Sequence, residues 1–205
     1  MFTTPRLVAI ALCAALNFAI GNIVYLVKLP IFLDSIGTIL CALLIFPDRL
    51  AAIVCAFIAG FIAAILTGLL LNPFLPWFSL TILAIAIVSA LLTGLATETF
   101  RARPLPPVSF LAKIVVCGLI TGIVSAILSA PVVVYLFGGV TGSGSTFVVA
   151  FFLKTGQQLL DSVVLAGLAT DPIDKVLQVL LAALLYRATP REFIAMIAAQ
   201  KTSPA

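Results

Sequence analysis

Ionisable side chains are scarce in this 205-residue chain, of which only 9% is charged, so those that interrupt its apolar runs are the first candidates for chemistry. Asp34 lies between two apolar segments in the stretch Leu29 to Thr38, LPIFLDSIGT. The others gather towards the C-terminal end: Lys154, Asp161, Asp171, Asp174 and Lys175. An unpaired charge in apolar surroundings is costly, so each should pair, face water or a ligand, or mark a helix end.

The residue types limit what chemistry these groups could support. The chain has no His, no P-loop spacing and no paired Cys ligands, so hydrolysis, metal catalysis and nucleotide-driven work have no sequence support. Its aspartates form no short acid–base motif, although a membrane-embedded enzyme that uses them stays open as a minor alternative. We therefore expect no catalytic residue, no cofactor and no metal. The four cysteines lie singly in apolar runs and are interpreted as small core residues: Cys13, Cys41, Cys55 and Cys117.

Composition places these residues in a membrane protein. The chain is 63% hydrophobic, far more than a soluble domain can bury, and its apolar runs of about 20 residues match the length of a membrane-crossing helix. The runs are apolar on all sides, which favours helices over the alternating strands of a barrel. The sequence thus predicts an all-α integral membrane protein, with residues 1–205 forming a single membrane domain. The net charge of +4 is expected to report orientation, not nucleic-acid binding.

Apolar runs and flanking charges predict a six-transmembrane-helix bundle. Five runs lie at Leu7 to Val27, Ser35 to Phe46, Leu50 to Leu71, Phe78 to Ala96 and Val108 to Phe137, and a last one at Val176 to Tyr186. Basic residues flank alternate ends of these runs and also follow the last one, which predicts cytoplasmic N- and C-termini. Phe147 to Ala169 is then an extended, partly helical outer segment, broken near Gly156. A seventh crossing by this segment is the less favoured alternative, because it leaves the basic tail outside.

Polar residues near the outer helix ends are the candidate ligand contacts. They are Asn22, Asp34, Thr38, Asn72, Lys154 and Gln157. Asp34 has two compatible roles, as the N-cap of the second helix and as a ligand contact, and the two asparagines could equally bond a neighbouring helix. Lys154 and Asp161, seven residues apart, are expected to share one helical face. Asp171, before Pro172 in TDPIDK, is interpreted as a helix N-cap at a boundary on the outer side.

Small residues recur every fourth position in four of the apolar runs, a pattern that allows close helix approach. Internal packing is the favoured interpretation for three of these stripes, which begin at Ala52, Ala86 and Gly118. The first run carries the fourth stripe: Ala11, Ala15 and Ala19.

Together these segments resemble a substrate-binding S component of the energy-coupling factor (ECF) transporters. The resemblance spans nearly the whole chain, and its most specific parts are KLPIFLDSIGTIL at Lys28 to Leu40 and TDPIDK at Thr170 to Lys175. It is supported by ALCAALN in the first run, the NP turn at Asn72, GGVTGSGS after Phe137 and KTGQ at Lys154.

The resemblance implies a bacterial or archaeal cell-membrane protein that captures a vitamin, a precursor or a similar micronutrient on the outer side. A separate T component and two ATPases would supply the energy, and the alanine stripe of the first helix would dock on the T component. The identity of the substrate is not implied. The alternative from another class is a membrane sensor module of a signalling system, which would need a separate signalling partner.

Overall fold

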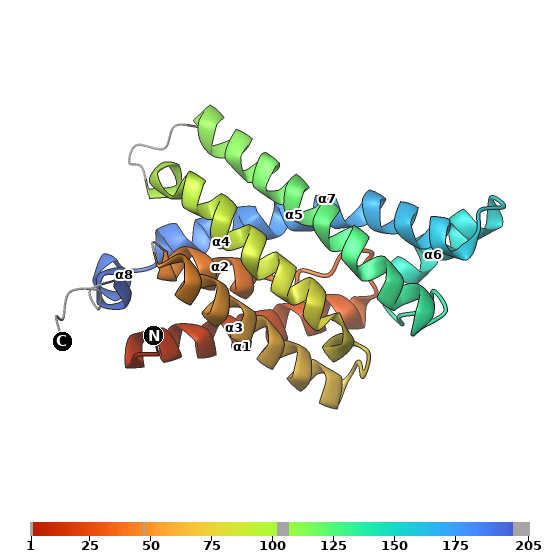
Figure 1. Cartoon of the computed structure of the whole chain (residues 1–205), viewed down its shortest axis with the longest axis horizontal. Helices are drawn as coiled ribbons and strands as arrows, with labels where there is room; N and C mark the ends of the chain where they lie inside the picture. The colour runs from red at the N-terminus through yellow and green to blue at the C-terminus, as the bar shows by residue number, and fades with distance from the viewer. Residues whose placement is uncertain (1, 47, 102–106, 199–205) are drawn as a thin grey trace.

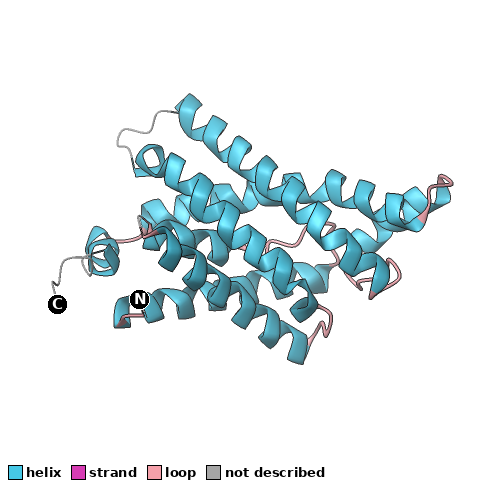
Figure 2. Cartoon of the chain, viewed as in Figure 1, coloured by secondary structure: helices cyan, strands magenta, loops and turns pink. Residues whose placement is uncertain are grey.

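The chain forms a bundle of helices in a computed structural model that describes residues 2–46, 48–101 and 107–198. The described residues form helices and no strand (Figure 2). In chain order the helices are α1 (Thr4–Val27), α2 (Ile36–Ile45), α3 (Arg49–Leu70), the 3-10 turn η1 (Leu75–Phe78), α4 (Ser79–Arg101), α5 (Pro107–Tyr135), α6 (Ser145–Lys154), α7 (Leu159–Ala188) and α8 (Arg191–Ala198). The prediction of an all-α protein is confirmed.

Four helical segments in the described part of the chain are long and apolar enough to cross a membrane: Thr4–Val27, Arg49–Leu70, Leu75–Leu92 and Val108–Phe137. Large apolar side chains also cover the outside of the bundle, as at Leu12, Leu69 and Val108, which are 60%, 77% and 82% exposed. Water would oppose such a surface, whereas lipid accepts it. These features are those of a multi-pass membrane protein.

Helix α2 is short and occupies the centre of the bundle. All ten of its residues are buried, and it packs against α1, α3, α4 and α7. Ten residues rise about 15 Å, roughly half of the hydrocarbon thickness. A non-helical stretch, the orange trace in Figure 1, leads from α1 to α2 and includes Leu33 in the left-handed region at φ 50°. The run predicted from Ser35 to Phe46 is therefore a half-length central helix.

Helices α6 and α7 correct the predicted organisation of the C-terminal region. The chain does break at Gly156, which has φ 88° and lies between α6 and α7. However, α7 then continues without interruption through Thr170 to Lys175, with Pro172 inside the helix. The N-cap of α7 is Gln158, so the prediction that Asp171 caps a helix at an outer boundary is wrong.

Close packing of α5 on α7 explains why α7 tolerates polar residues and a proline in its middle. A Cβ atom added at Gly122 would lie 2.4 Å from the Pro172 Cα, and one added at Gly118 would lie 2.4 Å from the Val176 Cα. The glycine stripe thus lets the two backbones touch, as predicted for internal packing. Asp171, Asp174 and Lys175 in the middle of α7 lie inside the bundle, whereas Asp161 near its start is exposed.

The described cysteines and the chain ends complete the arrangement. The four cysteines are buried and free, in agreement with their prediction as core residues. The start of α1 and the short α8 lie at the same end of the bundle (Figure 1).

Candidate functional site

A cavity of about 140 Å³ opens between the middle of the bundle and the end where α3 meets η1. Helices α1 to α7 and the segment after α1 all contribute to its wall. The volume is close to the roughly 150 Å³ of an engineered protein cavity that accommodates benzene. Much of the lining carries hydroxyl groups: Ser35, Thr38, Thr67, Thr81, Ser125, Ser129, Thr141, Ser143, Ser145 and Thr170. Apolar atoms still make up most of the wall, so it suits a small molecule with an apolar body and a few polar groups.

Asp174 lies beside this cavity and binds the segment that precedes α2. It is fully buried, and one of its carboxylate oxygens accepts hydrogen bonds from the backbone N–H groups of Phe32 and Leu33, at 3.1 and 3.0 Å. The other oxygen accepts from Lys175 Nζ at 2.8 Å and from Gln178 Nε2 at 2.7 Å. A buried carboxylate needs such partners to offset its lost hydration. Asp174 therefore fixes the non-helical segment before α2 against α7.

Side chains from other helices accept hydrogen bonds from two backbone N–H groups at the start of α2. Gln178 Oε1 accepts from the Ser35 N–H at 3.1 Å, and Asn17 Oδ1 accepts from the Gly37 N–H at 2.6 Å. Asn17 also donates to Thr38 Oγ1 at 2.9 Å. The N-cap position itself is Ser35, without a side-chain capping bond, so the predicted capping role of Asp34 is wrong. Because Gln178 and Asn17 accept from the N–H groups at the start of α2, the Asp34 carboxylate is available for another contact.

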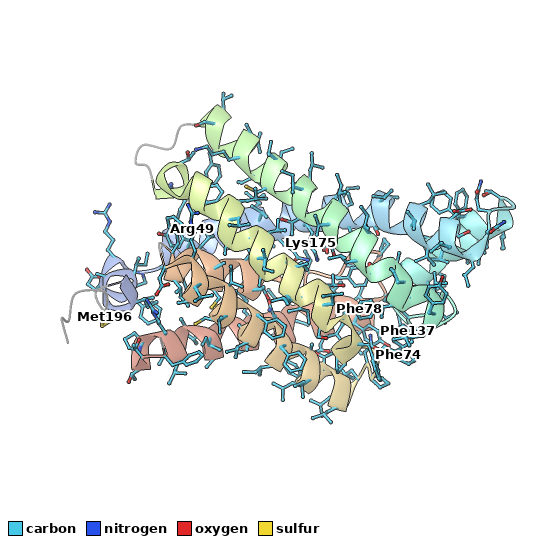
Figure 3. The ribbon with its side chains drawn as sticks, viewed as in Figure 1. Arg49, Phe74, Phe78, Phe137, Lys175 and Met196 are labelled. Atoms are coloured by element: carbon cyan, nitrogen blue, oxygen red, sulfur yellow. The ribbon has the colours of Figure 1, made fainter. Side chains whose placement is uncertain are left out.

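Lys175 links Asp34 to this network. Its ammonium lies 2.8 Å from Asp174 and 3.7 Å from Asp34, and the lysine side chain is 3% exposed. Figure 3 shows Lys175 near the middle of the bundle. Among the residues that line the cavity, all of them described, it is the single cationic side chain. Three carboxyl groups, those of Asp34, Asp171 and Asp174, thus surround or neighbour one ammonium.

Asp171 lines the cavity one helical turn before Lys175. The residue is 5% exposed, and within the described part of the chain its side chain has one hydrogen bond, from Thr170 Oγ1 at 3.4 Å. Thr81, on α4, also belongs to the lining and is 5% exposed, and its Oγ1 has no hydrogen-bond partner among the described residues. Weakly satisfied buried polar groups in a cavity wall are groups that a bound molecule can satisfy.

The loop between α5 and α6 contributes Thr141 and Ser143 to one end of the cavity wall. Lys28 donates to the Gly142 carbonyl, and its ammonium lies 4.1 Å from the centre of the Tyr25 ring. Thr141 and Ser143 are buried and joined by a 2.8 Å hydrogen bond. The centre of the Phe137 ring lies 4.4 Å from that of Phe74 and 6.0 Å from that of Phe78. Figure 3 shows these three residues close together. The glycine-rich loop is thus anchored on the end of α1.

The structure divides the predicted ligand contacts into two groups. Asp34, Thr38 and Asn72 line the cavity. Asn22 is buried outside the lining, where it donates to the Phe18 carbonyl and to Thr67 Oγ1, a structural role that the sequence left open. Lys154 and Gln157 are exposed beside the α6–α7 break and are not part of the lining.

The predicted arrangement of Lys154 and Asp161 on one helical face is wrong. The break at Thr155 to Gln158 places them in different helices, and both side chains are exposed. The break lies at one tip of the bundle, where water rather than lipid can surround an exposed charge, so that isolation costs little (Figure 1).

Sequence reasoning missed the largest part of the charged site. Asp171, Asp174, Lys175 and Gln178 were available as ionisable or amide residues at helical spacing in an otherwise apolar region, the pattern that marks functional residues inside membrane helices. The interpretation of TDPIDK as a helix boundary concealed this signal. Asn17 and Thr81 offered no comparable signal, because single polar residues occur in many membrane helices.

A comparison of the chain with protein-family models, curated proteins and solved structures gives no match to any of them. The functional argument therefore rests on the geometry of the site.

Proposed function

We propose that this protein is a membrane-embedded, non-enzymatic binding subunit for uptake of a small micronutrient such as a vitamin or vitamin precursor. It works with a separate ECF-type T component and two ATPase subunits, in a bacterial or archaeal cell membrane, with both termini cytoplasmic and six crossings. The observation that carries the proposal is the hydroxyl-rich cavity with buried charged residues beside it.

The cavity supports binding over catalysis. Its polar groups are spread over many elements, and the most buried charged groups, Asp174 and Lys175, are engaged by each other and by backbone N–H groups. Asp174 and Lys175 therefore maintain the shape of the cavity wall. A general acid or base would instead have to contact the reacting atoms of a substrate.

The alanine stripe of α1 supports docking on another membrane protein. Ala11, Ala15 and Ala19 are all exposed on the bundle surface. By contrast, the stripe residues of α3 and α5, such as Ala56 and Gly122, are buried against other helices. A groove of small residues on the outside allows close approach by a helix of another chain.

The proposal is tested by purifying the full chain and screening vitamins and their precursors by thermal shift, with co-expressed T component and ATPases in a parallel pull-down. We expect one compound class to raise the melting temperature and the T component to co-purify. Absence of any stabilising compound together with absence of the T component from the pull-down would reject the proposal.

A further inference from the structure

We infer that the cavity selects a small organic cation, with Asp171 as the carboxylate that binds its positive group. The inference rests on the proposed binding function and adds the chemical class of the ligand. It follows from the charge balance, the unsatisfied groups and the aromatic residues of the cavity wall.

The charge balance of the site favours a positive ligand. Asp34 and Asp174 already share the ammonium of Lys175, at 3.7 and 2.8 Å. Asp171 is also attracted by this ammonium but forms no ion pair with it, and its one hydrogen bond from the described residues comes from Thr170 at 3.4 Å. A carboxylate that is 5% exposed inside a membrane protein needs a positive partner or a proton. A ligand ammonium in the cavity would be that partner.

The same balance disfavours an anionic ligand. Lys175 is the single cation of the lining, all of which is described, and two carboxylates lie against its ammonium. An anion bound there would have to compete with Asp34 and Asp174 and would approach Asp171 as a like charge. Like charges close together in low dielectric repel strongly.

Two further features of the wall fit an organic cation. The side chains of Phe32 and Phe78 belong to the lining, and aromatic faces attract cations. Thr81, which is 5% exposed, presents a hydroxyl that has no hydrogen-bond partner among the described residues. The oxygen itself is almost fully covered, so a polar group of the ligand would bond it after the Thr81 side chain turns towards the cavity.

The test compares three probes of one size that differ in charge: benzylamine, which is protonated at neutral pH, benzyl alcohol and benzoate. A single ring suits a cavity of about 140 Å³. The full chain in lipid nanodiscs is titrated with each probe by ligand-observed NMR, and signal from empty nanodiscs is subtracted. We expect benzylamine to bind at least about 10-fold more tightly than benzyl alcohol, and benzoate to bind least.

Asp171→Asn should remove this preference, so that benzylamine and benzyl alcohol bind within about 3-fold of each other, since an amide cannot neutralise an ammonium. Asp161→Asn is the matched control, because Asp161 is exposed in the same helix and lies outside the lining. That control should keep the wild-type order of the probes.

The outcomes separate the two proposals. Binding of benzyl alcohol or benzoate as tightly as benzylamine by the wild-type protein would overturn the cation preference and leave the cavity as a binding site. Unchanged selectivity in a folded Asp171→Asn variant would overturn the role of Asp171. Failure of all three probes to bind would count against the cavity as a small-molecule site, and so against both proposals. The order of the wild-type probes needs no variant, so the inference is tested even if Asp171→Asn does not fold.

Discussion

At the scale of single residues, Asp174 connects parts of the chain that lie far apart in the sequence. Its contacts with Phe32 and Leu33 join positions 142 and 141 residues apart. They hold backbone N–H groups that neither water nor a helix could satisfy inside a membrane bundle. Its bond to Lys175 compensates two buried charges at once. Loss of Asp174 therefore removes a structural support and also a neighbour of the cavity.

We expect Asp174→Asn to destabilise the protein by about 3 kcal/mol, because it leaves the buried Lys175 ammonium with only the more distant carboxyl groups of Asp34 and Asp171. Thermal unfolding of the purified variant measures this loss. Asp161→Asn, an exposed site in the same helix, should change stability by less than about 0.5 kcal/mol.

A double variant sharpens this residue-level prediction. Asp174→Leu combined with Lys175→Met should be less destabilising than Asp174→Leu alone, since the double variant has no buried ammonium that has lost its closest carboxylate. If the double variant lost as much stability as Asp174→Leu and Lys175→Met together, the view that these groups compensate each other would be contradicted.

At the scale of helices, the contact between α5 and α7 determines where the charged residues lie. Gly122 → Val would place side-chain atoms where the Pro172 Cα now lies, since even a Cβ would approach to 2.4 Å. We expect a loss of at least about 2 kcal/mol in unfolding free energy from such overpacking. Ile123→Val, at the next position on the exposed face, should be nearly neutral. Equal melting temperatures for the two variants would contradict the close contact.

Helix α1 provides a second prediction at this scale, one that depends on the proposed function. Ala15→Leu should weaken co-purification with the T component by at least about 10-fold, because a large side chain blocks close helix approach. Ligand binding and melting temperature should stay unchanged, since Ala15 is exposed. Ile120→Phe, on the exposed face of α5, is the matched control. Full partner binding by Ala15→Leu would reject the docking role of the stripe.

At the scale of the whole molecule, the lengths of the apolar runs predicted the positions of the long helices. They did not predict the buried charged residues of α7 beside the cavity. The runs predicted at Leu7 to Val27 and Leu50 to Leu71 agree within a few residues with α1 and α3, because roughly 20 apolar residues have few alternatives to a spanning helix. The run from Ser35 to Phe46, counted among the six crossings, is the ten-residue α2. Asp34 lines the cavity, and its contact with a ligand stays a prediction.

The role of TDPIDK could not be predicted from local pattern. A proline preceded by Asp is typical of a helix start. Its place inside α7 depends on glycines of α5 and on backbone groups before α2, which are brought close only by the tertiary fold. Long-range contacts of this kind decide whether a polar segment of a membrane protein is a boundary or a buried network.

The central claim, that the cavity holds a small molecule, is tested most directly by native mass spectrometry of the protein purified from cells that contain its ligand. We expect one small molecule bound in a one-to-one complex with the wild-type chain. Thr81→Phe, which fills the cavity from its wall, should lose that molecule, whereas Leu80→Phe, on the exposed side of the same helix, should retain it. A chain without a bound molecule, or equal binding by Thr81→Phe, would contradict the claim.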